Sequence, residues 1–389
     1  MFELRQNVFT LFLLLCLLSC SSNPKSPIEP QNNTFISKPE VTFNLKSLPK
    51  QINVFYFDSR IKRRSTSQVL QGITSNYYYY KEKIGYIPEL NFIDLSNECL
   101  KDLNLRKDAF SIGLFLNYDS TQLNNNCYSE FIKTNGLIVS NNKNNSFNNK
   151  RFTRFNISRK LDIKNSLNIA KKNGNLRTII IDDPGTGDKA FLSKKWKEMG
   201  GEVISTATSG DQINSQKLLS EILLLEQSKI RSRKLSRIIG SEITNVPRKR
   251  NDIDSIFLST SLANARSLKP ALEYNFADNL SVYFIPSWNE NDYLTTNELD
   301  LENAIITEMP FLLHTSTTFQ KIDNTSKTRN FAIGYDSFEL ILLLNSDLKR
   351  NFEYFGLTGL ITYNSSTIKR TALSAKVIKG KLDYLDYKG

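Results

Sequence analysis

The chain has almost no histidine and little cysteine, and this removes several classes of chemistry at the outset. Its 389 residues include one histidine, His314, and four cysteines. No two cysteines have the C-x-x-C spacing of a zinc or thiol–disulfide site, so we expect no metal. The histidine follows an apolar run, and no G-x-S-x-G turn supplies a serine nucleophile. A Ser-His-Asp hydrolase is therefore not expected.

The chain also lacks the glycine-rich signatures of nucleotide binding. Asp182–Gly187 is a short loop after a predicted strand, where backbone N–H groups could hold an anion, but it has neither G-x-G-x-x-G nor G-x-x-x-x-G-K-[ST]. The carboxylate pairs Asp182/Asp183 and Asp252/Asp254 flank predicted strands, where turn and cap residues are usual. We expect turns at these places, with no cofactor and no catalytic residue. An enzyme that acts on the cell wall is therefore the least favoured of the functional hypotheses.

An apolar run near the N-terminus decides the compartment. Val8–Leu18 follows Arg5, is too short to span a bilayer and suits the core of a signal peptide. The run ends in Leu-Leu-Ser-Cys, which looks like a bacterial lipobox. We predict a signal peptide at 1–19 and a diacylglyceryl chain on Cys20, the first mature residue. Acyl chains contribute about 0.8 kcal/mol per buried methylene, so such an anchor is lasting.

Export changes what the charge and the cysteines mean. Ser21 stands where an aspartate would favour the inner membrane, so we predict the outer membrane, with the chain in the periplasm. The net charge of +12 would suggest nucleic acid in a cytosolic protein, but export removes that partner. Cys99 and Cys127 remain in an oxidising compartment. The sequence allows two alternatives, a disulfide between them or two free buried thiols.

The length suggests two lobes rather than one core. Residues 20–49 are rich in Ser, Asn, Pro and Lys and read as a flexible tether. Two successive series of strands and helices follow, at 50–160 and 161–310, and residues 311–389 return to complete both lobes. We predict an α/β fold in which each lobe is a parallel sheet flanked by helices. A cleft would lie at the carboxyl ends of the strands.

Particular segments carry this prediction. The apolar positions Val69, Ile73, Tyr77 and Tyr80 predict one face of a helix, as do Leu192, Trp196 and Met199 before Gly200-Gly201. Expected strands are Gln51–Phe57, Leu90–Leu95, Phe110–Leu116, Gly136–Ser140, Thr178–Ile181 and Val203–Thr206. Further expected helices are Ser215–Glu226 and Phe331–Leu344.

The stretch from Asp252 to Leu313 is the centre of the second series. The apolar run Ile256–Leu258 ends in Ser259-Thr260-Ser261, and a strand Val282–Ile285 follows. Between them Ala265, Leu268, Leu272 and Phe276 have helical spacing. Strand, helix and strand with short joints form a βαβ unit, which builds a parallel sheet.

This stretch also resembles a known family, the LppC family of penicillin-binding protein activators. The resemblance rests on PRKRNDIDSIFLSTSLANARSLKPALEYNFADNLSVYFIPS, then LDLENAIITEMPFLL, AIGYDSFELI and YFGLTGLITYN. The family typically shows an Arg-rich run before Asp-x-Asp, then Ala-Arg-x-Leu-Lys-Pro, and an Asp-Met-Pro-Trp segment that here reads Glu308-Met309-Pro310-Phe311. The match is strong over Arg177–Asn364 and weaker but collinear over Gln51–Ile157.

The resemblance implies a type I periplasmic-binding-protein fold that contacts protein rather than solute. Family members with a known role are outer-membrane lipoproteins that stimulate a class A penicillin-binding protein, a peptidoglycan synthase. Larger members carry an N-terminal helical-repeat domain. Only residues 20–49 separate the predicted anchor from the first strand here, so we expect that domain to be missing.

Two sets of site residues follow from these alternatives. For an activator, arginine and aromatic side chains are the usual interface anchors. The candidate partner surface is Arg231, Arg233, Arg237, Arg248, Lys249, Arg250 and Trp288. For a solute-binding lipoprotein of the branched-chain amino acid type, which shares the fold, the candidate cleft is Ser259, Thr260, Ser261 and Asp58. The activator is the preferred hypothesis, since the loop at Asp58-Ser59-Arg60 lacks the usual Ser-Gly.

Overall fold

The computed structural model describes most of the chain after residue 42. The described residues are 43–57, 63–96, 106, 109–116, 135–141, 152–210, 214–242, 246–288, 294, 297–313, 327–346, 351–364 and 367–385. They belong to one compact unit that spans 36–389. The predictions for Cys20, Asp58, Cys99, Cys127 and His314 lie outside the described residues.

The first sheet has eight strands, in the order β11-β12-β13-β5-β4-β3-β1-β2. Its bounds are β1 Gln51–Tyr56, β2 Glu89–Asp94, β3 Phe110–Phe115, β4 Asn135–Ser140, β5 Phe152–Asn156, β11 Asn351–Phe355, β12 Leu360–Asn364 and β13 Thr367–Thr371. The strands from β2 to β13 are parallel, and β12 and β11 add an antiparallel pair. The central strands are buried on both faces, as parallel strands covered by helices usually are.

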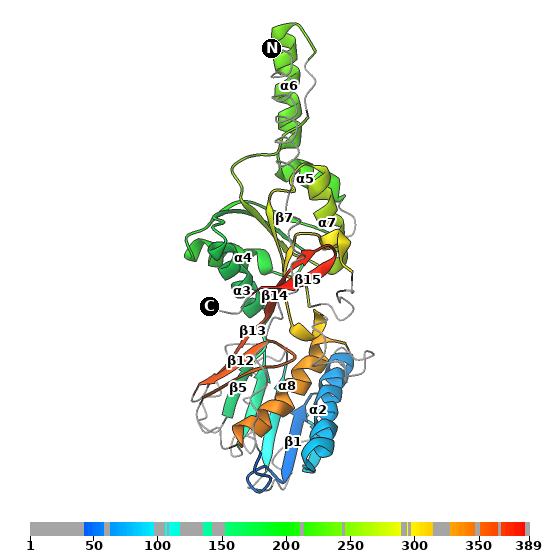
Figure 1. Ribbon diagram of the computed structural model, residues 1–389, viewed down its shortest axis with the longest axis vertical. Coiled ribbons are helices and arrows are strands. Elements are labelled where there is room, and N and C mark those ends of the chain that lie inside the picture. Colours follow the sequence, from blue (N-terminus) through cyan, green and yellow to red (C-terminus); the bar gives the residue numbers. More distant parts are fainter. Residues whose placement is uncertain are drawn as a thin grey trace, which may run out of the picture. The chain divides into compact units, whose positions relative to one another are not determined.

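Two helices, α2 (Arg63–Ile84) and α8 (Arg329–Leu344), pack side by side on this sheet (Figure 1). Almost every residue of α8 is buried, which matches its nearly continuous apolar sequence. Glycine makes the close approach possible. A Cβ at Gly334 would lie 1.9 Å from the carbonyl oxygen of Val69, and one at Gly72 would lie 2.1 Å from that of Phe331.

The second sheet has seven strands, in the order β15-β14-β10-β9-β8-β6-β7. Its bounds are β6 Arg177–Asp182, β7 Glu202–Thr208, β8 Ser255–Ser259, β9 Ser281–Phe284, β10 Ile305–Glu308, β14 Leu373–Ile378 and β15 Lys381–Tyr384. The strands from β7 to β10 are parallel, whereas β14 and β15 are antiparallel. The predicted α/β class with two mostly parallel sheets is confirmed.

Helices cover both faces of the second sheet. α3 (Arg159–Lys172) and α4 (Asp188–Glu198) enclose a core that contains Trp196, Phe257 and Tyr283. Side chains alternate along a strand, so the buried neighbours of Phe257 point to the other face. There α5 (Ser215–Ile222) packs against α7 (Leu262–Tyr274). Two short 3-10 turns, η5 (Leu299–Leu301) and η6 (Pro310–Leu312), complete the described helical segments.

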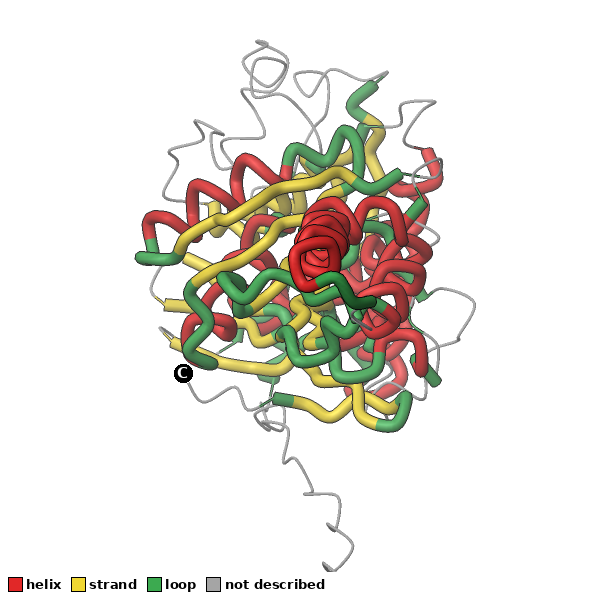
Figure 2. Tube along the Cα trace, turned by 90° about the horizontal axis from the view of Figure 1, so that it is seen from above, coloured by secondary structure: helices red, strands yellow, loops and turns green. Residues whose placement is uncertain are grey.

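Helix α6 (Leu225–Ile239) is an excursion from the second sheet. It stands clear of the other labelled helices in Figure 1, and Figure 2 looks down its axis. The chain leaves after Leu223 and returns at Arg250, whose N–H donates to the carbonyl oxygen of Leu223 at 3.0 Å. A second hydrogen bond, from Arg248 N to Ser228 Oγ at 2.9 Å, fastens the base of the excursion. None of the described helices is long and apolar enough to cross a bilayer.

The described strands change sheet at three places. The chain passes from β5 to α3, from β10 to α8, and from β13 through the buried Ala372 to β14. The last residues therefore contribute strands to both sheets, β11 to β13 to the first and β14 and β15 to the second. Side chains at these crossings become neighbours although they are far apart in sequence.

Some sequence predictions require correction. Phe276 does not extend the buried face of α7, because the helix ends at Tyr274 and Phe276 is exposed with a φ of 54°. The helix predicted over Ser215–Glu226 is two helices, since Leu224 adopts a left-handed conformation between α5 and α6. β5 and α3 were not predicted. The helix faces of Val69, Ile73 and Tyr80 and of Leu192 and Trp196 are confirmed as buried.

Candidate functional site

The predicted cleft residue Ser259 ends β8 and is fully buried. Its hydroxyl donates to Asp188 Oδ2 at 3.1 Å and accepts from Arg159 Nη2 at 3.0 Å. Arg159 also forms an ion pair with Asp188 and donates to the carbonyl oxygens of Ile285 and Pro286, each at 2.8 Å. Burial lowers the pKa of Arg159 to about 10, still well above neutral pH. The hydroxyl of Ser259 is therefore engaged by the protein itself.

The next two hydroxyls are engaged as well. Thr260 is buried, and its hydroxyl donates to the carbonyl oxygen of Ser261 at 3.2 Å. Ser261 is the N-cap of α7, where its Oγ accepts from Asn264 N at 3.3 Å. Asp183 accepts from Ser261 N at 2.5 Å and from Asn264 Nδ2 at 2.8 Å. Asp183 thus ties the end of β6 to the start of α7, where Ser261 is the N-cap.

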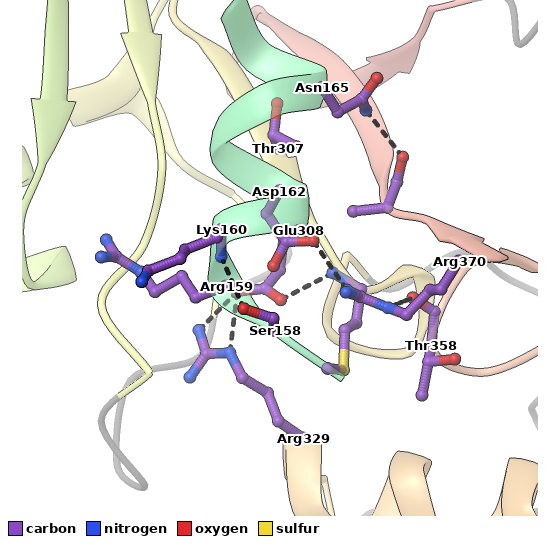
Figure 3. Close-up of polar contacts among 12 residues, drawn as sticks. Ser158, Arg159, Lys160, Asp162, Asn165, Thr307, Glu308, Arg329, Thr358 and Arg370 are labelled. Carbon is purple, nitrogen blue, oxygen red and sulfur yellow. Dashed lines mark hydrogen bonds and ion pairs between the residues drawn. The ribbon is translucent and has the colours of Figure 1, made fainter. Parts of the chain in front are cut away.

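A cluster of buried charges lies where the strands change sheet, and Figure 3 shows it. We call Asp162, Glu308, Arg329 and Arg370 the crossing cluster. All four side chains are nearly inaccessible. In each ion pair, one residue lies on a strand of one sheet and its partner lies on a helix that packs against the other sheet.

The first pair of the crossing cluster links α3 to β13. Arg370 Nη2 lies 2.9 Å from Asp162 Oδ1. Arg370 Nε donates to the carbonyl oxygen of Thr358 at 2.8 Å, and its guanidinium lies 5.8 Å from the ring centre of Trp288. Burial raises the pKa of Asp162 to about 6, and the positive charge of Arg370 opposes this rise. The carboxyl is thus easier to protonate in the folded chain than in water.

The second pair links β10 to α8. Glu308 is the last residue of β10, and Arg329 is the first residue of α8. Arg329 Nε donates to Glu308 Oε2 at 3.0 Å, and a second guanidinium nitrogen contacts the same oxygen. Glu308 Oε1 accepts from Met309 N at 2.6 Å. A buried, multiply bonded pair of this kind fixes the position of both elements.

Asp336 holds the turn that leads into β12. It accepts from Leu357 N at 2.9 Å, from Thr358 N at 2.7 Å and from the Thr358 hydroxyl at 2.6 Å. A Cβ at Gly356 would lie 2.6 Å from Asp336 Oδ2, so glycine is needed for this approach. The turn in turn presents the Thr358 carbonyl to Arg370. Sequence reasoning missed this whole network, because its members are scattered through the last two thirds of the chain.

The candidate partner surface divides into separate places. Arg231, Arg233 and Arg237 are exposed on α6, and Arg248 is exposed at its base. Arg250 pairs with Asp252 Oδ1 at 2.6 Å, which leaves it little exposed. Trp288 is half-buried against the core of the first sheet, beneath Arg370. The structure therefore does not join Trp288 to the basic residues of α6.

Among the described residues, no group of His, Cys, Asp and Glu side chains could hold a metal ion. A hollow lined by Asn214, Ser215, Gln216, Ser267 and Tyr274 lies between α5 and α7, but these side chains bond largely to one another or to the helix ends. Both carboxylates of the crossing cluster form ion pairs with arginine. The cluster therefore holds elements together and does not have the arrangement of a catalytic acid–base pair.

A family model, "LppC putative lipoprotein", matches residues 162–373, more than half of the chain. The chain belongs to the LppC family. The crossing cluster falls wholly within the matched residues.

Curated relatives carry the name penicillin-binding protein activator LpoA. The protein of Vibrio antiquarius is 23% identical over 192 residues, which is 47% of this chain and 32% of that protein. The protein of Aliivibrio fischeri is 20% identical over the same length and the same shares. The alignment thus spans about a third of the length of these relatives.

Solved structures show the same fold. Full-length LpoA of Haemophilus influenzae has a TM-score of 0.60 at 12% identity, covering 89% of this chain and 60% of that one. The LpoA C-domain from the same organism, described as a regulator of PBP1A, has a TM-score of 0.56 at 13% identity, covering 86% and 100%. A "putative branched-chain amino acid ABC transporter" from Rhodospirillum rubrum has a TM-score of 0.58 at 12% identity, covering 87% and 100%.

The family motifs have structural roles in this LppC chain. In Ala265–Pro270, Arg266 pairs with the buried Glu298 and Lys269 pairs with Glu273. In the segment where the family typically has Asp-Met-Pro-Trp, Glu308 holds Arg329, and Phe311 stacks on Phe331 with ring centres 5.5 Å apart. Glu308 and Phe311 therefore stabilise the crossing from β10 to α8.

Proposed function

We propose that this chain is a lipoprotein, anchored in the outer membrane through Cys20, that activates a class A penicillin-binding protein by direct contact. Its role would be regulatory and without catalysis. The observation that carries the proposal is membership of the LppC family, over residues that build most of the second sheet and the crossings. Relatives in that family are named as activators, and one C-domain is described as a regulator of PBP1A.

The state of the predicted cleft supports contact with protein rather than capture of a solute. A solute binder of this fold would offer the hydroxyls at the end of β8 to an amino acid. Ser259 is instead bonded to Arg159 and Asp188, and Ser261 caps α7. A ligand there would have to break these bonds, and each buried polar group left without a partner costs about 1–3 kcal/mol.

The anchor is argued from the sequence. Val8–Leu18 has the length of a signal-peptide core and is followed directly by Leu-Leu-Ser-Cys. Metabolic labelling with an alkyne fatty acid, followed by membrane fractionation, tests this part by itself. Label on the wild type but not on Cys20→Ala is expected, and label on both variants would reject lipidation at Cys20.

We look for the activating contact beside the second sheet, because most of its strands lie within the residues that match the family. Arg248 and Lys249 lie at the base of the α6 excursion, and we keep them as candidate contacts with the synthase. Arg248→Glu with Lys249→Glu should weaken binding by more than twofold. If affinity changes by less, roughly 0.4 kcal/mol, the contact lies elsewhere. Ile87→Asp, an exposed residue outside the second sheet, is the matched control.

The test of the function uses the chain from Ser21 onward, which contains the whole compact unit, and a class A penicillin-binding protein of its own organism. We expect the rates of glycan polymerisation or of crosslinking to rise when the chain is added. Unchanged rates with every such synthase of the organism would reject the proposal. An amino acid found in the denatured protein by mass spectrometry would favour the solute-binding alternative.

A further inference from the structure

The free end of α6 exposes aliphatic side chains that the protein does not cover. Leu235 is 52% exposed, Ile238 81% and Ile239 61%, and Val246 on the returning chain is 54% exposed. Leu235, Ile238 and Ile239 are spaced at i, i+3 and i+4, so they share one side of the last turn. Scattered exposed apolar residues are ordinary, but such a group at the end of one helix indicates an interaction site.

The rest of the same helix is strongly basic. Lys229, Arg233 and Arg237 follow one another at intervals of four and form a stripe on the side opposite the aliphatic group. Arg231 lies one turn before Leu235 on the aliphatic side, and Lys234 lies at the edge of that side. Of the acidic residues, Glu226 is paired with Lys229, and Glu242 follows the helix. Within the described residues, Arg231, Arg233, Lys234 and Arg237 form no ion pair.

We propose that the end of α6 inserts its aliphatic side chains into an anionic phospholipid bilayer, while the basic residues bind the lipid phosphates. A helix with a basic polar face and aliphatic residues on the other side is the usual form of an interfacial membrane helix. Long basic side chains can extend from the helix to the headgroup layer as the aliphatic end enters the acyl region. The inference does not depend on the activator function.

The pattern fits a bilayer better than a groove on a protein. A helix that docks in a protein groove needs apolar anchors along its length, at i, i+3, i+4 and i+7. The preceding positions on the same side are Arg231, Ser232 and Ser228, none of which is apolar. The half-exposed Ile230 lies beside Lys234, away from that side. A second copy of the chain is disfavoured because two equally basic helices repel each other.

The position of α6 also suits this role. The excursion is closed by the hydrogen bonds of Leu223 with Arg250 and of Ser228 with Arg248, so its base is fixed and its end is free. No other labelled helix runs beside it in Figure 1. Its free end can therefore reach a surface without any rearrangement of the two sheets.

The experiment is co-sedimentation of the chain from Ser21 onward with vesicles, which removes the lipid anchor from the measurement. Vesicles of phosphatidylglycerol and phosphatidylethanolamine are compared with vesicles of phosphatidylcholine, at 0.05 M and 0.5 M NaCl. We expect at least tenfold stronger partition to the anionic vesicles at low salt, and a loss of most of that preference at high salt, because the Debye length becomes much shorter.

Three variants separate the parts of the proposal. Ile238→Asp with Ile239→Asp should lower the partition at least tenfold, and Arg231→Glu, Arg233→Glu and Arg237→Glu together should remove the preference for anionic lipid. Ile87→Asp is the matched control, since Ile87 is 64% exposed in the loop between α2 and β2, and it should bind like the wild type. Circular dichroism before and after heating confirms that each variant is folded.

A fluorescence measurement reports insertion directly. In Ile239→Trp, lipids brominated in the acyl chains should quench part of the emission. The wild type, whose Trp196 is buried and whose Trp288 is half-buried against the core of the first sheet, should lose none. Equal binding to neutral and anionic vesicles, or unchanged binding of the Ile238/Ile239 variant, would overturn the proposal. Loss of synthase binding in that variant with unchanged vesicle binding would assign the surface to protein instead. Because no synthase is present in the vesicle assay, its failure leaves the activator proposal standing.

Discussion

At the scale of single residues, the chain is distinguished by charges that it buries in the crossing cluster. Asp162 and Arg370 are almost inaccessible, and each would be costly without the other. Burial raises the pKa of Asp162 although Arg370 is beside it, so loss of solvent outweighs the attraction of the ion pair. Two predictions follow from this balance.

The first concerns pH. Asp162 has a folded-state pKa of about 6 against an ordinary value of 3.8, so the folded chain holds this proton more tightly than the unfolded chain. Protonation therefore stabilises the fold, and the contribution falls as pH rises from about 4 to about 6. Asp162→Asn removes the titration. The stability of the wild type minus that of Asp162→Asn should decrease over this range, by up to about 3 kcal/mol, and be level above it.

Urea unfolding of both proteins at several pH values measures this difference. If the stability difference stays constant or grows with pH, the pKa of Asp162 is set by the charge of Arg370 and not by burial. Other carboxylates titrate equally in both proteins, so they cancel.

The second prediction concerns the pair itself. Arg370→Met should leave Asp162 buried and unpaired, lowering the free energy of unfolding by about 3–5 kcal/mol. Adding Asp162→Leu should restore most of this loss, because no buried charge then remains. The midpoint of urea unfolding reports both values. Equal stability of the single and double variants would contradict a cost that comes from the uncompensated charge.

At the scale of elements, the contact between α2 and α8 depends on two glycines. Alanine is normally the better helix former by about 1 kcal/mol, so Gly334→Ala would stabilise an isolated helix. Here the added Cβ would meet the Val69 carbonyl oxygen at 1.9 Å. The same reasoning applies to Gly72 and the backbone of Phe331.

We therefore predict that Gly334→Ala lowers the free energy of unfolding by about 1–3 kcal/mol, the usual cost of overpacking. Lys234→Ala, on the exposed face of α6, is the control and should change stability by less than about 0.5 kcal/mol. Thermal unfolding followed by circular dichroism measures both. A stabilised Gly334→Ala variant would mean that the helices can separate without cost.

At the scale of the whole molecule, the structure predicts that α6 can be removed without loss of the fold. The ends of the excursion are already joined by the hydrogen bond from Arg250 N to Leu223 O. Replacing residues 224–249 with two glycines should leave the unfolding temperature within about 2–4 °C of the wild type, a change of roughly 1 kcal/mol for a unit of this size. The same variant should lose its binding to anionic vesicles.

Calorimetry and the vesicle assay test the two halves of this prediction separately. Unfolding of the shortened chain at room temperature would show that α6 is part of the core after all. A folded variant that still binds anionic vesicles would place the lipid contact outside α6.

Most of the local elements and the α/β class could be predicted from patterns within short segments of the sequence. Alternating or helical apolar spacing at Val69, Ile73, Leu192 and Trp196 is a local property, so these faces could be recognised without the structure. The family motifs around Ala265–Pro270 and Glu308–Phe311 were recognisable for the same reason, since each lies within one short segment. Helix breaks such as Leu224 were missed because a leucine in a left-handed conformation has no local signal.

The pairing of the buried charges depends on how distant segments pack. Asp162 and Arg370, or Glu308 and Arg329, become partners because the chain changes sheet three times among the described strands, and sequence spacing contains no trace of such pairing. The hydroxyls of Ser259 to Ser261 illustrate the same limit. Their place at a strand end was predictable, but their engagement by Arg159 and Asp183 depends on where distant segments pack. Burial and charge pairing are long-range properties, and the fold alone determines them.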